Sequence, residues 1–436
     1  MSMDLTPFFA REGQQPFDNR VMAMPWRNQR PLDGDSISQG WRQLRQRTLP
    51  ARKRLLYIHI PFCATHCSFC GFYQNPLKSD STAVYTECLL SELQLEADSP
   101  LHQSAPIHGV YLGGGTPTAL TAAELNRVIR RIRHSLPLAP DCEITVEGRV
   151  LNVDDERLDA CLDAGVNRFS IGIQTFDTRI RRRMGRISDG ETAIAFLERL
   201  CRRDRAAVVC DLLFGLPGQT LSSWRDDLKI ISELPLDGVD LYALNVLAGT
   251  PLYKAVENGR TTLPDVTERL AFYRAGADVL AGQGWHQLSN SHWAKTSRER
   301  NLYNLLIKQG ADYLALGSGA GGSLDGQAYM LERNLERYYQ RVRLGEKPIA
   351  MMTAPHAPEP WQHQLQGGIE TGRVALSALT DHSDALRPLL SQWQRAGLIV
   401  DDSSCMRLTV DGRFWANNLL QALRLLIPRL ADEADR

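Results

Sequence analysis

Three cysteines stand close together in the segment CATHCSFCGFY, where Cys63, Cys67 and Cys70 have the spacing C-x3-C-x2-C. Disulfides explain them poorly, because three thiols cannot pair off and the first residues contain no apolar stretch typical of a secretory signal. A structural zinc ion needs four ligands, and only His66 stands nearby as a fourth. Three thiolates in one loop suit a 4Fe–4S cluster whose remaining iron is free to bind a small molecule. The spacing favours an iron–sulfur cluster, with a zinc site or an incidental group of thiols as alternatives.

A second group of chemically suited residues follows apolar, strand-like runs: the glycines of LGGGTPT (112–118), then Glu147, Gln174 and Asp211. Glycines, which lack a Cβ atom, let backbone amides approach a ligand closely. Taken singly, a glycine run is often only a tight turn, a strand-end acid is often solvated, and a polar residue in an apolar strand often satisfies nearby backbone. Their position at the ends of consecutive strands favours one shared site.

The elements that position these residues alternate between short β-rich runs and longer segments of helical period. Strands are predicted over 55–60, 109–114, 143–147, 168–173, 207–214 and 238–244. Helices are predicted over 121–132, 156–165, 191–201, 222–234 and 267–282, the first with a capping box of Thr121 and Glu124. This order predicts an α/β fold with a parallel sheet. A full or partial barrel is favoured over an open sheet, because polar or glycine residues follow nearly every strand.

Three regions are expected along the chain. Residues 1–50 are rich in Arg, Gln, Pro and Asp without a clear period, and we interpret them as an irregular extension. Residues 51–345 contain the barrel and elaborations around a substrate site. Residues 350–436 change to helical patterns with a short β-like stretch at 405–412, which predicts a small, mainly helical, winged-helix-like domain.

The composition is that of an ordinary globular protein: 436 residues, 43% hydrophobic, 23% charged and no formal net charge. This balance does not support a nucleic-acid partner, although a basic run occurs at 179–186. No stretch of about 18 apolar residues occurs, so a membrane span is not expected. Six further cysteines stand singly and are expected to be buried and reduced, as in a cytoplasmic protein: Cys88, Cys142, Cys161, Cys201, Cys210 and Cys405.

With its cysteine loop directly after the first strand, the chain resembles the radical S-adenosylmethionine (SAM) superfamily. The segments YIHIPFC, GGGTP, GIQTFD and DLLFGLPGQT, with Glu147 and Arg186, resemble one branch of it: oxygen-independent coproporphyrinogen oxidases and their haem-binding relatives. The resemblance runs from about residue 50 to 330 and continues weakly to 407–412. It implies a partial (βα)6 TIM-like radical SAM barrel.

In that branch two SAM molecules lie side by side. The resemblance implies that the first is held by Tyr57, Gly114 and Glu147 and the second by Phe69, Gly115, Thr116, Gln174, Arg186 and Asp211. Arg186 has a plainer alternative, as one of several solvated arginines. The glycine-rich segment 317–322 matches a family segment near the substrate, or is simply a flexible loop.

Departures from the family pattern separate the members of the branch. The oxidases carry a further cysteine where this chain has Phe72, which argues against propionate decarboxylation. The haem chaperones carry a His-Asn-x-x-Tyr-Trp segment, whereas residues 300–305 are RNLYNL, and their stretch before the C-terminal domain is altered to QGGIETGRV. The segment CSFCGFYQN, the N-terminal extension and 286–294 instead resemble the haem-utilisation members, the anaerobic C-methyltransferases called anaerobilin synthases.

This resemblance implies a reaction. A flavodoxin or flavin-type reductase reduces the cluster, one SAM is cleaved, and the methyl of the second is transferred to haem, whose macrocycle opens to release iron and a linear tetrapyrrole. A non-catalytic haem chaperone and a coproporphyrinogen III decarboxylase are the alternatives. Four histidines are available as haem-iron ligands, with His292 the first choice: His59, His66, His286 and His292.

Overall fold

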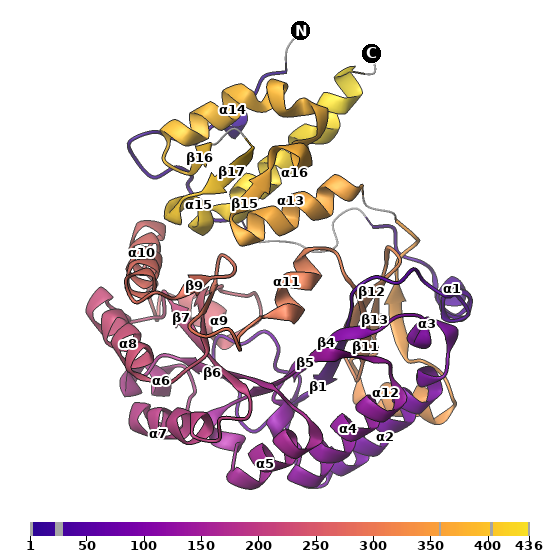
Figure 1. Cartoon of the computed structure of the whole chain (residues 1–436). Coiled ribbons are helices and arrows are strands. Elements are labelled where there is room, and N and C mark those ends of the chain that lie inside the picture. Colours follow the sequence, from indigo (N-terminus) through magenta and orange to yellow (C-terminus); the bar gives the residue numbers. More distant parts are fainter. Residues whose placement is uncertain (1–2, 22–28, 357–358, 402–403, 435–436) are drawn as a thin grey trace.

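The computed structural model describes residues 3–21, 29–356, 359–401 and 404–434 (Figure 1). Its centre is a twelve-stranded sheet in the order β14-β13-β12-β11-β1-β4-β5-β6-β7-β8-β10-β9. Seven neighbouring strands run parallel: β11 (Asp312–Leu316), β1 (Arg54–Ile60), β4 (Ile107–Gly114), β5 (Leu138–Gly148), β6 (Arg168–Gln174), β7 (Ala207–Phe214) and β8 (Gly238–Ala243). All six predicted strands are therefore confirmed.

The sheet is a partial barrel, as predicted, because its two edge strands do not pair with each other in the described residues. The sequence did not indicate the short strands that extend it at both ends. They are β9 (His286–Gln287), β10 (His292–Ala294), β12 (Gly321–Leu324), β13 (Gln327–Leu331) and β14 (Ile349–Met352). These are antiparallel additions of two to five residues, too short to show a clear period.

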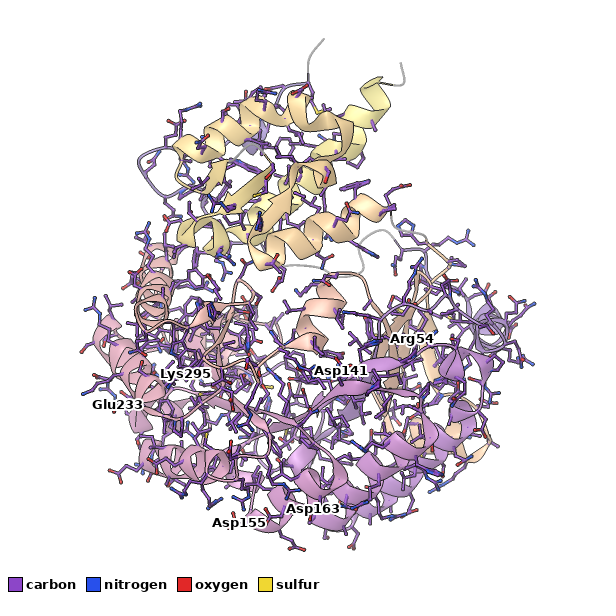
Figure 2. All side chains as sticks on the ribbon, viewed as in Figure 1. Arg54, Asp141, Asp155, Asp163, Glu233 and Lys295 are labelled. Carbon is purple, nitrogen blue, oxygen red and sulfur yellow. The ribbon has the colours of Figure 1, made fainter. Side chains whose placement is uncertain are left out.

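Helices cover the outer face of the sheet. They are α2 (Ser81–Ala97), α3 (Pro100–Gln103), α4 (Ala122–Ser135), α5 (Asp155–Ala164), α6 (Thr178–Arg183), α7 (Gly190–Cys201), α8 (Leu221–Glu233), α9 (Pro251–Glu257), α10 (Val266–Gly282) and α12 (Leu335–Arg343). The predicted capping box of Thr121 and Glu124 starts α4. Asp155, Asp163 and Glu233 on these helices point to solvent, as Figure 2 shows. No described helix combines the length and apolar character that a membrane crossing requires.

Alternation along the strands separates the two faces of the sheet. Leu56, Ile58 and Ile60 of β1 belong to the large core under the helices, while Leu55 points to the inner face. There Leu55 packs with Tyr303 of α11 (Leu302–Lys308), a short helix inside the curve of the sheet. The inner face is therefore filled at one end by α11.

The C-terminal elements are mainly helical, as predicted, with a small sheet in the order β15-β17-β16. They are α13 (Pro360–Thr371), β15 (Arg373–Ala375), the 3-10 helix η4 (Leu376–His382), α14 (Ser383–Arg395), β16 (Ile399–Asp401), β17 (Cys405–Leu408), α15 (Val410–Phe414) and α16 (Ala416–Ala434). Asn290 joins them to the barrel, because its side-chain amide donates to the carbonyl of Ile369 at 2.9 Å. Figure 1 shows these elements above the sheet.

The expectation of an irregular N-terminal extension is wrong for residues 34–45. They form α1 (Gly34–Arg45), which Asp33 caps through the backbone N–H of Ser36 and which buries Trp41. A short 3-10 helix, η1 (Thr6–Phe8), precedes it. The apolar residues of α1 occur at helical spacing, but the polar residues between them hide the pattern: Ile37, Trp41 and Leu44.

Residues 3–21 pack against the C-terminal elements and not as a free tail. The backbone N–H of Ala10 donates to the side-chain carbonyl of Gln392 at 2.8 Å, and the Gln392 amide donates back to the carbonyl of Ala10. Trp393 donates its indole N–H to the carbonyl of Phe8 at 3.1 Å. The two ends of the chain therefore form one packed region.

We expect Gln392→Ala to lower the free energy of unfolding by about 1–3 kcal/mol, because both backbone groups of Ala10 lose a buried partner. Gln394→Ala, two residues along the same helix and exposed, is the matched control and should change it by less than about 0.5 kcal/mol. Urea unfolding measures the difference, and limited proteolysis within residues 3–21 gives a second readout. Equal effects of the two variants would contradict this packing.

Candidate functional site

The cysteine loop starts where β1 ends. Cys63 closes β2 (Phe62–Cys63), which pairs with β3 (Asn75–Pro76) and so brings the two ends of the loop together. The backbone N–H of Leu77 donates to the carbonyl of Cys63 at 2.9 Å. The loop therefore projects from the carboxyl end of the first barrel strand, where α/β barrels build their sites.

Three neighbouring loops hold the cysteine loop in place. Arg149, after β5, donates to the carbonyl and the hydroxyl of Thr65 at 3.0 and 2.9 Å. The N–H of Ser68 donates to the carbonyl of Met184 at 3.2 Å, and the carbonyl of Ser68 accepts from Leu252 at 2.8 Å. Contacts from the loops after β5, β6 and β8 therefore fix the conformation of this segment.

The three cysteines of the loop are not joined in disulfides, and they share one environment. Burial raises the pKa of the Cys63 and Cys70 thiols, and the neighbouring Cys67 raises both further. The hydrogen bonds to the sulfurs are long: the Thr116 hydroxyl is 3.4 Å from Cys63, and the Phe72 N–H is 3.4 Å from Cys70. Thiolates in this place need a cationic centre to stabilise them, so the donor set fits an iron–sulfur cluster.

The geometry argues against a single zinc ion. Within the described ranges, no group of three or more His, Cys, Asp or Glu side chains is arranged to hold one metal ion. In a four-iron cluster each thiolate binds a different iron, so three sulfurs need not converge on one point. The described side-chain geometry therefore does not support a single zinc ion, whereas it remains compatible with a four-iron cluster.

Next to this loop, the glycine tract after β4 makes a close backbone approach. The N–H of Gly115 donates to the carbonyl of Ile60 at 2.8 Å, and a Cβ atom on Gly115 would lie only 2.7 Å from the carbonyl oxygen of Phe62. Gly114 has a left-handed φ of +107° and donates its N–H to Glu147 at 3.2 Å. Only glycines allow the tract to lie this close to the cysteine loop.

The residues expected at the first SAM are brought together around Glu147. Its carboxylate accepts from the Tyr111 hydroxyl at 2.7 Å, and burial raises its pKa. Tyr57 lies on the neighbouring strand, 6.4 Å from Tyr111 between ring centroids, and its hydroxyl is 3.0 Å from His59 Nδ1. The His59 ring in turn lies against Gly114, where a Cβ would approach it to 2.5 Å.

The residues expected at the second SAM form a neighbouring group. Gln174 has a left-handed φ of 69°, and its side-chain carbonyl is buried without a partner. Arg186 donates to the carbonyl of Gly172 at 3.1 Å, while its Nε has no partner. Burial lowers the pKa of Arg186 to about 10, and the charges of Cys67 and Cys70 act against this decrease. Unpartnered buried polar atoms beside the cysteines indicate a place for a polar ligand.

Arg186 and Phe69, both expected at the second SAM, are packed against other parts of the protein. Arg186 is 8% exposed, so the alternative of a solvated arginine is wrong. Phe69 packs against an apolar cluster that contains Ile180, Met184 and Leu252. Phe69 therefore anchors the cysteine loop to the loops after β6 and β8.

Asp211, the remaining residue expected at the second SAM, lies on β7. Its carboxyl accepts from the Ser170 hydroxyl at 3.0 Å, and burial, followed by the charge of Asp240, raises its pKa to about 8. Asp240 itself lies 2.9 Å from His292. Asp240 was not predicted as a site residue, although a carboxylate in the otherwise apolar strand GVDLYAL could have indicated it.

The interpretation of His292 as a haem-iron ligand is wrong. The residue is wholly buried, and each ring nitrogen lies within ion-pair distance of a carboxylate: Nδ1 is 2.9 Å from Asp240 and Nε2 is 3.0 Å from Glu299. His59 is buried between the Tyr57 hydroxyl and the Gln74 amide, and burial lowers its pKa to about 4. His66 and His286 are exposed.

The segment 317–322 is not a flexible loop. The N–H of Gly317 donates to the buried carboxylate of Glu92 at 2.9 Å, and the N–H of Ser318 donates to the Tyr85 hydroxyl at 3.0 Å. A Cβ on Gly319 would lie 2.6 Å from the side chain of Gln74, which belongs to the cysteine loop. The glycines therefore allow close packing under that loop.

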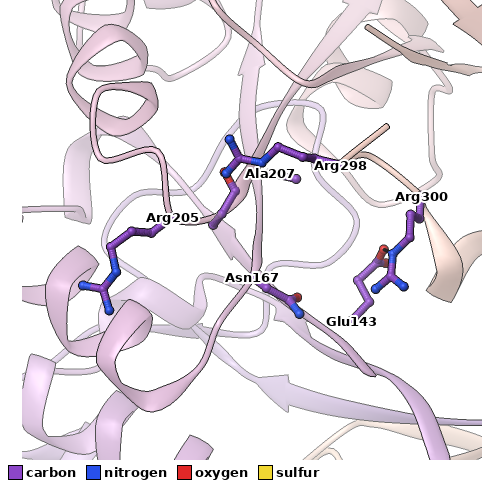
Figure 3. Close-up of a pocket in the computed structure, with 7 residues that line it drawn as sticks. Glu143, Asn167, Arg205, Ala207, Arg298 and Arg300 are labelled. Atoms are coloured by element: carbon purple, nitrogen blue, oxygen red, sulfur yellow. Dashed lines mark hydrogen bonds and ion pairs between the residues drawn. The ribbon is translucent and has the colours of Figure 1, made fainter. Parts of the chain in front are cut away.

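A cavity of about 210 Å³ lies at the opposite end of the strands (Figure 3). It is lined by Glu143, Asn167, Arg205, Ala206, Ala207, Arg298 and Arg300. Arg205 is paired with Asp163 at 2.9 Å, and Arg298 is paired with Asp204. Because these arginines already have carboxylate partners, the cavity does not share the character of the cysteine site.

Comparison with known proteins supports the same assignment. The family described as the radical SAM superfamily matches residues 57–231. An anaerobilin synthase of Escherichia coli O157:H7 is 59% identical over 427 residues, which cover 98% of this chain and 96% of that protein. The heme chaperone HemW of Bacillus subtilis (strain 168) is 27% identical over 84% of this chain and 98% of that protein.

The same fold occurs in a solved structure, that of coproporphyrinogen III oxidase (HemN) from Escherichia coli. The two structures agree with a TM-score of 0.73 over 88% of this chain and 93% of that one, at 24% sequence identity. This likeness supports the partial barrel with its C-terminal helical region, and it concerns the fold alone.

We expect Gly115→Ala to weaken cluster binding and to cost about 1–3 kcal/mol of stability, because the added methyl meets the backbone carbonyls of Phe62 and Ile60. Gly282→Ala is the control: its Cβ would meet nothing within 4 Å, and in a helix it should leave stability unchanged or slightly raised. Iron and sulfide content after anaerobic reconstitution, with thermal unfolding, measure both. Full cluster content in Gly115→Ala would contradict the close approach.

Proposed function

The chain belongs to the radical SAM superfamily, and we propose that it degrades haem anaerobically: using two SAM molecules, it C-methylates and opens the macrocycle, releasing iron and a linear tetrapyrrole. The observation that carries this proposal is the 59% identity to an anaerobilin synthase over 98% of the chain. The cysteine loop, the glycine tract and Glu147 meet at one end of the barrel, which is consistent with this chemistry.

Cys63, Cys67 and Cys70 would bind three irons of a 4Fe–4S cluster. When bound, the cluster supplies the electron that cleaves SAM. Around it, the N–H groups of the glycine tract and the carboxylate of Glu147 would bind the amino acid and ribose groups of the first SAM. The partial burial of Glu147 leaves its carboxylate accessible from the lumen of the barrel.

For the second SAM, this chain offers a fixed cation and a fixed amide. The Nε of Arg186 and the side-chain carbonyl of Gln174 are buried and lack partners in the described structure, which costs free energy until a ligand satisfies them. Gln174 is held in a left-handed conformation that few non-glycine residues adopt. We infer that both side chains are preorganised for the carboxylate and amine of SAM.

The aromatic lining of the inner face would exclude water from one end of the lumen. The rings of Tyr111 and Tyr303 lie 4.7 Å apart between centroids, and Tyr57 stacks on Tyr111. Exclusion of water from this end of the lumen strengthens electrostatic contacts there and protects reactive intermediates from hydrolysis. This supports chemistry that must proceed without solvent.

The electron donor is proposed to be a flavodoxin or a flavin-type reductase. Cys70 is only half-buried and Phe72 is 67% exposed, so the cysteine loop is accessible from outside the barrel. We also propose that the protein acts in the cytoplasm, because the three cysteines of the loop are reduced thiols.

We expect Cys63→Ala, Cys67→Ala and Cys70→Ala each to lose the cluster and to lose SAM cleavage by at least about 100-fold, because each would remove one of its three protein ligands. Cys201→Ala, which changes a half-buried thiol on α7, is the control and should keep both. Iron content, the cluster absorbance and the yield of 5′-deoxyadenosine measure the effect. Retained SAM cleavage in any of the three would exclude the cluster assignment.

One product analysis separates the candidate functions. The reconstituted protein is incubated without oxygen with dithionite, SAM and haem, or with coproporphyrinogen in place of haem. A methylated open tetrapyrrole is the expected product. Unchanged haem bound in stoichiometric amount would indicate a chaperone, as the heme chaperone relatives suggest, and vinyl products from coproporphyrinogen would indicate a decarboxylase.

A further inference from the structure

Two carboxylic side chains stand next to each other inside the barrel. Asp211 of β7 and Asp240 of β8 are Cα partners in the parallel register. Their chain neighbours Cys210 and Val239 are buried in the core under the helices, so the alternate residues Asp211 and Asp240 point to the inner face. Two adjacent carboxylates in a poorly solvated place cannot both ionise at low cost.

Asp240 is the one that the structure holds as an anion. Its Oδ2 lies 2.9 Å from His292 Nδ1, and His292 Nε2 lies 3.0 Å from Glu299. Arg168 closes the series with its Nε 3.0 Å from Glu299. All four side chains are at most 2% exposed.

These four residues, which we call the ion quartet, balance their charges. Two carboxylates, Asp240 and Glu299, face two cations, His292 and Arg168. A doubly protonated His292 can donate from both ring nitrogens, which is the only protonation state that serves a carboxylate on each side. The pKa shifts agree with this state: the two carboxylates raise that of His292 to about 9, and its cationic partners lower that of Glu299 to about 2.

Asp211 has no such cation. Its only side-chain hydrogen bond in the described structure comes from the neutral hydroxyl of Ser170, at 3.0 Å. The other ionisable groups that act on its carboxyl, or on which it acts, include Glu147 of β5, Tyr111 of β4, Arg168 of β6, its chain neighbour Cys210, and Asp240 and Tyr242 of β8. Of these, only Arg168 is a cation, and it is already paired with Glu299.

We propose that the ion quartet fixes the negative charge on Asp240, that Asp211 consequently carries a proton while the lumen holds no cation, and that binding of the sulfonium cation of SAM releases that proton. Asp240, His292, Glu299 and Arg168 then act as positioning residues, since they set the state of Asp211 without facing the ligand. The proposal rests on the proposed function only in taking SAM as the cation.

Binding of SAM and protonation of Asp211 oppose each other. A cation binds better to ionised than to neutral Asp211, so SAM affinity should rise about tenfold per pH unit below the pKa of Asp211 and level off above it, near pH 8. About one proton should be released per protein molecule at pH 7, on binding of the SAM that lies at Asp211. The neutral analogue S-adenosylhomocysteine, which has no sulfonium charge, should not show this release.

The test is proton counting by isothermal titration calorimetry of the reconstituted protein with SAM. Titrations in two buffers of different ionisation enthalpy, between pH 6 and 9.5, give the number of protons exchanged and the dissociation constant at each pH. Asp211→Asn should release about one proton fewer per protein molecule than the parent at pH 7, and the difference should vanish at pH 9.5. Because the titratable groups of SAM itself are common to both proteins, the difference isolates Asp211.

The ion quartet is tested by Asp240→Asn, which keeps the size of the side chain and removes its charge. Without that charge, the pH at which affinity levels off should fall by about one to three units, so that the proton release at pH 7 falls to about half of a proton or less. Glu92→Gln is the control, because it removes another buried carboxylate, one that is not among the groups acting on Asp211 or on the ion quartet. It should leave the pH profile unchanged.

A direct readout does not depend on any variant. The infrared difference spectrum of the parent protein on addition of SAM at pH 7 should lose a protonated-carboxyl band, and the spectrum of Asp211→Asn should not. Equal proton release from the parent and Asp211→Asn, or no carboxyl band in the parent, would overturn the proposal. If SAM fails to bind at all, the proposed function fails first; if SAM binds but haem is not converted, the proton count still decides this inference.

Discussion

Charge inside the barrel has to be compensated inside the barrel, and this constraint organises the site. The inner face carries the carboxyl groups of Glu143, Glu147, Asp211, Asp240 and Glu299. Isolated ionised carboxylates there would cost several kcal/mol each, so they must be paired, hydrogen-bonded or protonated. The structure uses all three solutions: the ion quartet pairs Asp240 and Glu299, Tyr111 and Gly114 donate to Glu147, and Asp211 is left with only Ser170.

The same constraint explains where ligands are accommodated. The fully compensated groups lie deep in the barrel and are at most 2% exposed, whereas Glu147 and Asp211 remain partly accessible. Arg186 and Gln174 extend the accessible set with polar atoms that have no partner. Without a ligand, these buried groups lower the stability of the fold. A bound cofactor that is both charged and polar would satisfy them and remove this free-energy cost. The uncompensated part of the inner face is therefore the part that adjoins the cysteine loop.

Much of the fold could be predicted from the sequence, because the parallel strands are buried on both faces and appear as continuous apolar runs. The short antiparallel strands and α1 could not, since two to five residues carry no period and the apolar positions of α1 are diluted by polar ones. The cysteine loop and the strand-end residues were predictable from spacing and position. His292 was misinterpreted because its partners Asp240 and Glu299 come from other elements, and no local pattern in NSHWA reveals that each ring nitrogen lies within ion-pair distance of a carboxylate.

A shared fold does not distinguish the different activities within this branch, whereas the residue types at single positions near the site differ between its members. The likeness to the coproporphyrinogen oxidase covers most of the chain at 24% identity, yet one position near the cysteines differs in kind. Where a thiol would be expected by that resemblance, Phe72 presents a ring that is 67% exposed. A phenyl ring cannot donate a proton, bind iron or exchange electrons, so whatever a thiol does at that position is lost here. It can, however, stack on a flat aromatic ligand, and the loop that carries it is held by contacts from three neighbouring loops. The side chain at this position therefore differs in its chemistry from a thiol, while the fold around it is shared.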